Sequence, residues 1–374
     1  MSVRPTVLEV SKSALEHNYR AIEAEALNGG ARPIFVVKAD GYGLGAVQMA
    51  TWAREWGADF FGVATPDEAL ELREAGFVQP ILVLGASPYD AAELYVERDI
   101  RPAVTDLAFV ERLSKAATKM GKTVKVHIKM DSGMGRIGFL RDELLAVVDV
   151  VAASPGVEIE GMFTHFSTSD EADLTWTHEQ FKTFSATVTD VRAKGIEPGI
   201  IHCCNSGALM AGLRDYYCDR VRPGHIIYGL LPSGECGDAI EIVRPFTLKT
   251  RVALVRDVPE GWGISYGRTY RAKVGERTAV LPIGYADGFP RALSNKGEAL
   301  IRGRRCPILG RICMDQMVVG VGHVEDVATG DEAVLIGAQG GEELSILEVA
   351  GQAGTITGAL PTSLTPRVPR VYVD

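Results

Sequence analysis

Apolar and polar positions along the first 230 or so residues follow two alternating patterns. Short apolar, β-branched runs, typical of buried strands, are separated by longer amphipathic stretches, typical of helices. The predicted strands are residues 34–38, 60–64, 81–85, 101–104, 125–130, 159–166, 200–205 and 220–229. The predicted helices, which lie between most of these strands, are residues 47–57, 66–76, 89–99, 105–121 and 172–195.

Alternation of strands and helices predicts a sheet of parallel strands. Eight such strands fit a closed (β/α)8 barrel of the TIM type. An open doubly wound sheet is the alternative, but its first strand is usually followed by a GxGxxG turn. No such turn follows the first predicted strand here.

The pattern changes at about Arg244, after which helical stretches nearly vanish. Short alternating runs separated by glycine, proline and aspartate predict a mainly-β domain. These runs are residues 247–255, 278–282, 299–301, 317–321 and 332–336, and residues 345–353 form the one plausible helix. We therefore expect an α/β chain of two domains, a barrel over residues 1–243 and a β domain over residues 244–374.

Composition narrows the class of protein. A length of 374 residues with 46% hydrophobic residues suits two globular domains. The net charge of −9 argues against nucleic acid or an anionic membrane as the main partner. The sequence shows neither a signal peptide nor an apolar run of membrane-spanning length, so we expect a cytoplasmic protein. The six cysteines match no metal-binding spacing, and we expect reduced thiols and no metal site.

Candidate chemistry begins with Lys38, which ends the first predicted strand in FVVKADGYGLG. Side chains at the C-terminal ends of barrel strands surround the mouth, where barrel active sites lie. A single lysine there is more often a solvated surface residue. Polar or loop-forming residues, however, follow several other predicted strands, namely Lys129, Met134, Arg136, His165, Asn205, Ser206, Arg222, Gly224 and His225. Their gathering at one end predicts an active site.

A phosphate site is expected after the seventh and eighth strands, where such barrels frequently bind phosphate. Ser206 offers a hydroxyl group and starts a helix-like run, so backbone N–H groups can face an anion there. Gly224 allows the backbone to approach a ligand closely. A lysine able to form a Schiff base, together with a phosphate cradle, indicates pyridoxal 5'-phosphate (PLP) as the cofactor.

An ordered series of segments covers nearly the whole chain from Ile34 onward. The segments are VVKADGYGLGA, KMDSGMGRIGF, FTHFSTSDE, NSGA, VRPG, SYGRTY, IGYADGFPR and GRICMDQM. In this order they resemble the successive motifs of the alanine racemase family. The resemblance implies a PLP-dependent isomerase that interconverts the L and D forms of a small amino acid. It also implies a barrel followed by a β domain, with residues 1–10 as a strand on the β domain, and a homodimer with shared active sites.

Catalytic and cofactor-binding roles follow from the resemblance residue by residue. Lys38 is implied to link to PLP and to act as one catalytic base, and Tyr266 from the partner subunit to act as the second. Removing a proton from one face and returning it to the other suits two opposed bases. At the phosphate, the implied cofactor-binding residues are Tyr42, Ser206, Gly224 and the N–H of His225. His165 is implied at the pyridine ring and Arg222 at its nitrogen. Asn205 is a further implied cofactor-binding residue.

Substrate-binding roles are implied in the same way. Arg136 and the backbone of the partner subunit's Met314 are implied to fix the substrate carboxylate. Lys129 occupies a position that is carbamylated in many family members, and the resulting anion can orient Arg136. Tyr285 and Gly358 are the remaining residues implied at the substrate.

Two positions depart from the family pattern. Gly358, in AGTITGALP, stands where the family usually has a tyrosine that contacts the phosphate and lines the substrate pocket. Its absence puts strict alanine specificity in doubt, and we expect serine to be racemised as well. His225 replaces a residue that is usually aliphatic, a change we expect to be tolerated because the contact comes from the backbone.

Two other functions remain open at this stage. One is a PLP-dependent amino-acid decarboxylase with the same barrel, but these enzymes place a carboxylate at the pyridine nitrogen, where this sequence has Arg222. The other is a non-catalytic PLP-binding protein, which resembles the barrel alone. The SYG motif argues against the first alternative and the β domain against the second.

Overall fold

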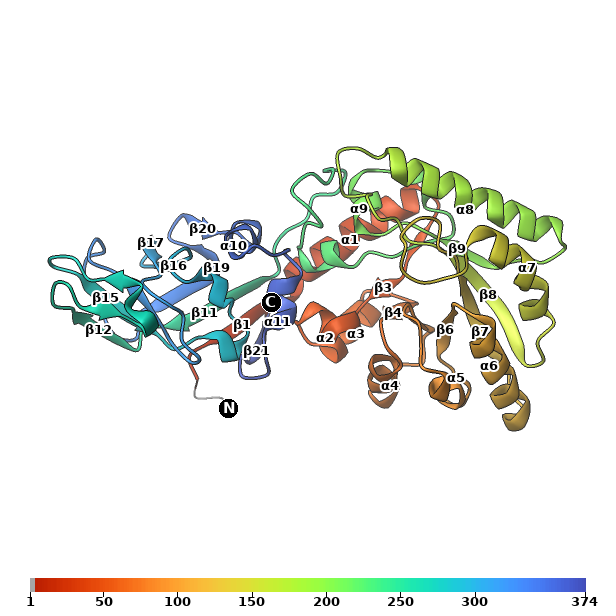
Figure 1. The fold of residues 1–374 in the computed structure, drawn as a ribbon, viewed down its shortest axis with the longest axis horizontal. Helices are drawn as coiled ribbons and strands as arrows, with labels where there is room; N and C mark the ends of the chain where they lie inside the picture. Colours follow the sequence, from red (N-terminus) through yellow and green to blue (C-terminus); the bar gives the residue numbers. More distant parts are fainter. Residues whose placement is uncertain (1–3) are drawn as a thin grey trace. The chain divides into compact units, whose positions relative to one another are not determined.

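The computed structural model describes residues 4–374, coloured along the chain in Figure 1. Contacts within the chain divide it into two compact units. One unit is Glu16–Val243, called here the barrel unit. The other, the β unit, joins the N-terminal segment up to Leu15 to Arg244–Asp374. Each unit is described by itself.

The strands of the barrel unit form one parallel sheet in the order β2-β10-β9-β8-β7-β6-β5-β4-β3. They are β2 (Arg32–Pro33), β3 (Phe35–Val36), β4 (Phe61–Val63), β5 (Ile81–Val83), β6 (Arg101–Val104), β7 (Val124–Lys129), β8 (Val157–Phe163), β9 (Ile200–His202) and β10 (Arg220–Val221).

This sheet closes on itself at Ile34, the single residue between β2 and β3. The Ile34 N–H donates to Val221 O at 2.8 Å on one side, and the Phe35 N–H donates to Phe60 O at 2.9 Å on the other. Residues 32–36 are therefore one strand that pairs with both the second and the last strand. The predicted eight-stranded barrel is confirmed.

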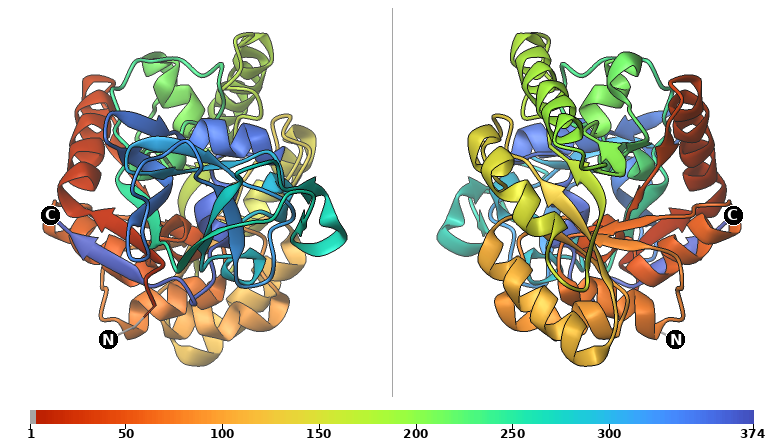
Figure 2. Two further views of the ribbon diagram at one scale, coloured as in Figure 1. Left: turned by 90° about the vertical axis from the view of Figure 1, so that its left-hand side faces the viewer. Right: turned by 90° about the vertical axis from the view of Figure 1, so that its right-hand side faces the viewer.

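Helices lie outside these strands, as Figure 2 shows. They are α1 (Lys12–Asn28), α2 (Lys38–Tyr42), α3 (Ala46–Glu55), α4 (Pro66–Glu74), α5 (Ala92–Glu97), α6 (Leu107–Met120), α7 (Arg141–Ala152), α8 (Thr175–Ala193) and α9 (Ser206–Met210), with 3-10 turns η1 (Tyr89–Ala91), η2 (Arg214–Tyr216) and η3 (His225–Tyr228). Helix α6 shows how the sequence sets these elements. Asp106 caps its first turn by accepting from the Phe109 N–H, Phe109 and Leu113 lie on its buried face, and Gly121 ends it in the left-handed conformation.

Two expectations about the barrel elements are wrong. The predicted strand 220–229 stops at Val221, because Pro223 has no N–H to give a neighbouring strand and Gly224 turns the chain into η3. Lys38 does not end a strand but opens α2. Helices α1 and α7 were also not among the predicted helices.

The β unit is built on a sheet in the order β17-β16-β19-β11-β1-β21, with β20 paired to β19. These strands are β1 (Val7–Ser11), β11 (Phe246–Arg251), β16 (Glu298–Ile301), β17 (Arg304–Pro307), β19 (Glu332–Gln339), β20 (Glu342–Leu344) and β21 (Arg370–Val373). Strand β1 lies antiparallel to β11 and parallel to β21. Residues 1–3 of the expected N-terminal strand lie outside the described residues.

Smaller sheets complete this unit. They comprise β12 (Leu254–Asp257), β15 (Arg277–Leu281) and β18 (Met317–Gly320) in one sheet, and β13 (Gly263–Ile264) with β14 (Tyr270–Arg271) in another. The expectation of a single helix is wrong, because α11 (Ala359–Ser363) follows α10 (Ile346–Ala353). Helix α11 has only five residues and includes Pro361, so it is too short to show a helical period in the sequence.

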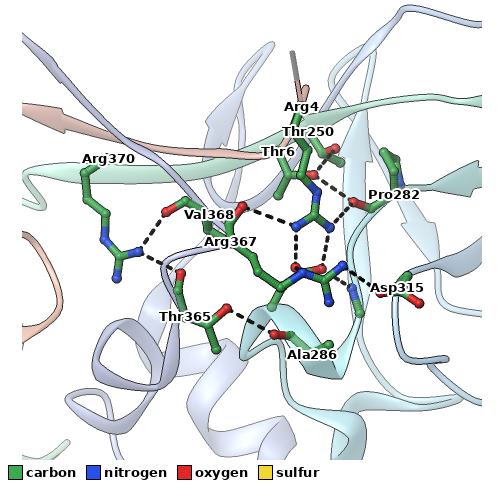
Figure 3. Close-up of polar contacts among 12 residues, drawn as sticks. Arg4, Thr6, Thr250, Pro282, Ala286, Asp315, Thr365, Arg367, Val368 and Arg370 are labelled. Atoms are coloured by element: carbon green, nitrogen blue, oxygen red, sulfur yellow. Dashed lines mark hydrogen bonds and ion pairs between the residues drawn. The ribbon is translucent and has the colours of Figure 1, made fainter. Parts of the chain in front are cut away.

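Asp287 is fully buried in the β unit. It lies among residues from segments that are distant in the sequence, of which Figure 3 labels Arg4, Ala286 and Thr365. Its carboxylate accepts a forked pair of hydrogen bonds from Arg4 and another from the Gly284 N–H at 2.9 Å. The Asp287 carbonyl accepts from the Thr365 N–H at 3.0 Å. Together these contacts fix the 3-10 turn η5 (Tyr285–Asp287), which carries Tyr285.

Candidate active site

Lys38, His165, Ser206 and Arg222 each follow the C-terminal end of a barrel strand, namely β3, β8, β9 and β10. Because these strands are parallel, the four side chains belong to the same end of the barrel. The structure thus brings together the barrel residues that the sequence singled out.

The chain turns sharply after Lys38. Ala39, Asp40, Gly41 and Tyr42 all have φ between 53° and 60°, so they form a left-handed turn. Left-handed helical geometry costs roughly 1–2 kcal/mol for each residue other than glycine. Strain of this kind persists only where surrounding contacts impose it, and it is common at functional sites.

Two carboxylates hold this strained turn in place. Glu68 Oε1 accepts from the Ala39 N–H at 2.7 Å, and Glu68 Oε2 accepts from the Ala64 N–H at 2.6 Å. Asp40 Oδ1 accepts from the Ala46 N–H at 2.8 Å. Glu68 therefore ties the loop after β4 to the residue beside Lys38.

The Lys38 amine is half-buried at the mouth and has no hydrogen-bond partner within residues 4–374. Burial lowers its pKa below the ordinary lysine value, and the charge of Arg136 lowers it further, whereas Glu68 acts in the opposite direction. The amine is thus easier to deprotonate than an exposed lysine, which suits a base or a nucleophile.

Arg222 is a buried cation with no carboxylate among the partners that the structure gives it. Its guanidinium donates to His202 Nδ1 at 2.9 Å, to Thr164 O at 2.7 Å, to Cys203 O at 2.9 Å and to His165 Nδ1 at 3.2 Å. Burial lowers its pKa to about 10, so it stays charged at neutral pH. The Nε–H has no acceptor in the part of the chain that the structure describes.

His165 is held beside Arg222 as a neutral imidazole. Burial takes its pKa well below the ordinary value, and the charge of Arg222 adds to this effect. Because Arg222 can only donate, His165 Nδ1 must accept, which leaves the ring proton on Nε2.

A group of donors that could bind an anion lies near Lys38, with His225 close enough for its pKa to be lowered by the lysine charge after burial. Ser206 Oγ accepts from the Gly224 N–H at 2.9 Å, and a Cβ on Gly224 would lie 2.2 Å from Tyr42 Oη. Only glycine therefore lets this backbone meet the Tyr42 phenol. His225 opens η3 and Ser206 opens α9, so their N–H groups have no partner within those turns.

Asn205 holds the neighbouring loops rather than standing free. Its side-chain oxygen caps α9 by accepting from the Ala208 N–H at 3.1 Å, and it also accepts from Ser169 Oγ at 2.7 Å. Its amide group donates to Phe166 O at 3.1 Å. The side chain thus ties the loop after β8 to the start of α9.

Lys129 and Arg136 are placed by the segment after β7. Lys129 is almost fully buried, and burial lowers its pKa to about 7. The Asp131 carboxylate accepts from the N–H groups of Gly133, Met134, Gly135 and Arg136 at 2.7–3.1 Å. It thereby shapes the loop that presents the exposed Arg136 side chain.

The β unit carries the other predicted site residues. Tyr266, Met314 and Tyr285 are 70%, 52% and 42% exposed, which is high for such large side chains. The Tyr285 N–H donates to Cys313 O at 3.1 Å, and Ser265 Oγ contacts Cys313 Sγ at 3.2 Å. The three residues therefore lie close together. Gly358 is buried at the start of α11, where its carbonyl accepts from Thr362 Oγ1 at 2.7 Å.

Comparison with known proteins decides the family. The N-terminal domain of alanine racemases matches residues 10–232, and their C-terminal domain matches residues 245–372. The chain belongs to the alanine racemase family. It is 45% identical to the alanine racemase of Desulfovibrio desulfuricans over 99% of both chains. It is 42% identical to that of Clostridium perfringens over 99% of this chain and 96% of the relative.

Solved structures of the alanine racemase family agree with this fold. The alanine racemase of Bacillus anthracis, solved with L-Ala-P, has a TM-score of 0.93 at 37% identity over 100% of this chain and 96% of the other. The histidine racemase of Leuconostoc mesenteroides has a TM-score of 0.91 at 30% identity, over 100% of this chain and 99% of the other.

Alanine racemase family members are PLP-dependent isomerases, and the donors at this mouth fit that cofactor. Tyr42, Ser206 and the N–H groups of Gly224 and His225 are suited to a phosphate, and a side chain on Gly224 would fill this cradle. The Arg222 Nε–H, which has no acceptor within residues 4–374, is suited to an unprotonated ring nitrogen. Lys38 supplies an amine whose pKa burial lowers below the ordinary lysine value.

Sequence reasoning missed several residues that hold this family's site. His202, Phe163 and Asp131 contact predicted site residues directly, and Glu68 binds the N–H of Ala39, the residue after Lys38. The Phe163 ring lies 5.5 Å from Lys129 Nζ, 5.4 Å from the Arg222 guanidinium and 4.8 Å from the His202 ring. A histidine inside an apolar strand was the available signal for His202. No helix within residues 4–374 is long and apolar enough to cross a membrane.

We predict that Asp131→Asn loosens the loop that carries Arg136. The amide NH2 cannot accept the backbone N–H groups that the carboxylate binds, and the loss of hydrogen bonds to a charged group costs about 1.5–3 kcal/mol. Hydrogen exchange at residues 133–136 should therefore accelerate by roughly tenfold or more at pH 7. Backbone N–H groups outweigh the effect of burial and lower the Asp131 pKa.

The stabilisation by Asp131 should be constant above about pH 4 and should be lost as the pH falls through the lowered pKa. Asp142→Asn is the matched control, because its side chain is 94% exposed. Equal exchange in both variants would contradict the role given to Asp131.

Proposed function

We propose that this chain is an alanine racemase that interconverts L- and D-alanine by a two-base mechanism. The observation that carries the proposal is Arg222, a buried guanidinium at the place where a decarboxylase of this fold has a carboxylate. A fixed cation leaves the ring nitrogen of PLP unprotonated, which favours return of the α-proton over transamination as a side reaction.

PLP, when bound, withdraws electrons from an attached amino acid and makes its α-proton acidic. Lys38, whose pKa burial lowers below the ordinary lysine value, takes or returns this proton on one face. The Tyr266 phenol does so on the opposite face. Tyr42, Ser206, Gly224 and the His225 N–H hold the phosphate, and the neutral His165 lies against the ring.

Substrate binding is assigned to Arg136, whose guanidinium pairs with the substrate carboxylate together with the backbone of Met314, while Tyr285 borders the substrate. We propose that Lys129 is carbamylated. Formation of a carbamate requires an unprotonated amine to attack CO2 with loss of one proton, and burial lowers the Lys129 pKa to about 7. The resulting anion orients Arg136.

The protein is proposed to be a homodimer in which the barrel unit binds PLP and the β unit supplies Tyr266 and Met314 to the partner subunit's site. The exposure of Tyr266, Met314 and Tyr285 on the β unit supports this arrangement. The cytoplasmic location expected from the sequence stays a prediction.

The two bases are tested by Lys38→Ala and Tyr266→Phe. With PLP linked to Lys38, the wild-type protein should be yellow, and borohydride should bleach this colour. Lys38→Ala should lack the colour and should lose nearly all activity with L-alanine, measured by chiral analysis of the product. Tyr266→Phe should lower turnover about 10²–10⁴-fold with PLP still bound. In deuterated water its residual exchange should differ between the enantiomers, because only the Lys38 face still exchanges.

Tyr270→Phe is the matched control for Tyr266→Phe, because Tyr270 lies on the neighbouring strand β14 and binds Glu276 at 2.8 Å. The two-base scheme fails if Tyr266→Phe exchanges both enantiomers equally and at the wild-type rate. A fully active Lys38→Ala variant would overturn the proposed function itself.

Shared sites are tested by mixing subunits. A heterodimer of Lys38→Ala and Tyr266→Phe subunits contains one site with both defects and one site with none. Each homodimer should retain at most about a hundredth of the wild-type activity, and mixing should restore up to half of the wild-type activity per heterodimer. Absence of recovery, once subunit exchange is shown by mass spectrometry, would mean that each site is built from one chain.

We propose further that L-serine is racemised with an efficiency comparable to that of L-alanine. The support is Gly358, which lacks the phenol that usually lines the pocket. The histidine racemase of Leuconostoc mesenteroides, at 30% identity, also indicates that this architecture serves side chains larger than a methyl group. A change of one small group in a pocket usually shifts specificity by about 1–3 kcal/mol, so we expect a mixed enzyme rather than an exclusive one.

The measurement is kcat/KM for both amino acids in wild type, Gly358→Tyr and Thr355→Tyr. Gly358→Tyr should raise the preference for alanine roughly 10–200-fold. Thr355→Tyr adds the same ring at an exposed position nearby and should leave the preference unchanged. A thousandfold preference for alanine in wild type, or an unchanged ratio in Gly358→Tyr, would exclude Gly358 as the determinant.

A further inference from the structure

A chain of buried polar side chains runs from Arg222 through the strands of the barrel. Arg222 donates to His202 Nδ1 at 2.9 Å, His202 Nε2 lies 2.8 Å from His127 Nδ1, and His127 Nε2 lies 3.3 Å from Glu160 Oε2. Both histidines are fully buried. None of the roles proposed above uses His127 or Glu160.

The two ends of this chain fix its direction. Arg222 can only donate, so His202 Nδ1 must be unprotonated and His202 Nε2 must carry the proton. His202 then donates to His127 Nδ1, and His127 donates from Nε2 to Glu160. Glu160 ends the chain as an acceptor, since burial raises its pKa but the contacts with His127 and Arg101 outweigh this and bring it to about 2.

The fold keeps room for this chain. Gly161 on β8 pairs with His127 on the neighbouring strand β7. A Cβ at Gly161 would lie 2.3 Å from His127 Nδ1 and 2.7 Å from Ile200 O. Only glycine therefore lets the His127 ring meet His202 from the strand on the other side of β8.

Further contacts hold the acceptor end. Arg101 Nε donates to Glu160 Oε2 at 3.2 Å, and Lys125 Nζ lies 3.3 Å from Glu160 Oε1. The Glu160 side chain is only 13% exposed and that of Arg101 only 8%. The carboxylate thus cannot turn away from His127 without leaving Arg101.

We propose that Glu160 is a positioning residue for Arg222, because it fixes through His127 and His202 the direction of the hydrogen-bond chain that ends on the guanidinium. The proposal deepens the function given above, since it concerns the group that faces the ring nitrogen of PLP. Without an acceptor at Glu160, His127 gains by placing its proton on Nδ1. His202 Nε2 must then accept from His127, so the His202 proton moves to Nδ1. There it faces the Arg222 N–H, and the repulsion between the two donors displaces the guanidinium.

Glu160→Gln and Glu160→Leu test this proposal. Glutamine keeps an acceptor oxygen and loses the charge, whereas leucine removes both. Glu160→Leu should weaken PLP binding by the apoprotein roughly tenfold, and Glu160→Gln should retain most of the affinity. In Glu160→Leu, kcat should fall while the KM for alanine stays within about twofold, because no member of the chain is proposed to touch the amino acid. Glu158→Leu is the matched control, because Glu158 is 52% exposed on the same strand.

A readout that does not depend on activity is the tautomer of each histidine in the apoprotein. Nitrogen-15 NMR should show His127 and His202 with the proton on Nε2 in wild type, and a mixture in Glu160→Leu. If Glu160→Leu does not fold, His127→Phe replaces it, since this variant removes the middle of the chain and leaves the Glu160–Arg101 pair in place.

Three results would overturn the proposal. The first is that Glu160→Leu keeps the tautomers and the PLP affinity of the wild type. The second is that Glu160→Gln and Glu160→Leu lose PLP affinity equally. The third is that His202 in the wild type carries its proton on Nδ1. The tautomers and PLP affinity are measured without racemisation. A protein that lacks racemase activity but shows these shifts would therefore contradict the proposed function and leave the role of Glu160 standing.

Discussion

The site depends on a guanidinium that is buried without a carboxylate beside it. Moving a charge out of water is costly, and an ion pair is the usual compensation. Arg222 is instead stabilised by two backbone carbonyls, two neutral imidazoles and the face of Phe163. None of these groups carries a negative charge, so the positive charge of Arg222 acts on the neighbouring titratable side chains. The lowered pKa values of His165 and Lys129 both have Arg222 as the largest cause after burial.

Carboxylates in this molecule act on the backbone around the site rather than in it. Asp131 binds the N–H groups of the loop before Arg136, and Glu68 binds the N–H beside Lys38. Within the β unit, Asp287 likewise binds the backbone of the turn that carries Tyr285. Negative charge is thus placed where it rigidifies loops, and the mouth itself stays positive. This separation suits a site for an anionic cofactor and a substrate carboxylate.

The sequence predicted the barrel because its strands and most of its longer helices carry a recognisable hydrophobic pattern, and the strand ends then located Lys38, His165, Ser206 and Arg222. It did not predict the end of β10, because the apolar run beyond Val221 is the same in a strand and in the buried turn η3. It also missed Glu68 and Asp131. Their carboxylates accept from backbone N–H groups that point inward only because of the left-handed turn and the loop geometry, and neither feature leaves a periodic pattern in the sequence. His127 and His202 were hidden for a related reason, since their pairing across β8 depends on three-dimensional register and on Gly161.

The position of β1 has a consequence for synthesis of the chain on the ribosome. Strand β1 lies between β11 and β21, so residues 7–11 complete a sheet whose other strands begin at Phe246. At about 5–20 residues per second, roughly 12–50 s pass before β11 follows β1 out of the ribosome. During that interval β1 has an unpaired edge and an apolar face, while the barrel is able to assemble behind it. Strand β1 is thus made long before the strands that pair with it, and this delay exposes it to chaperones and to aggregation.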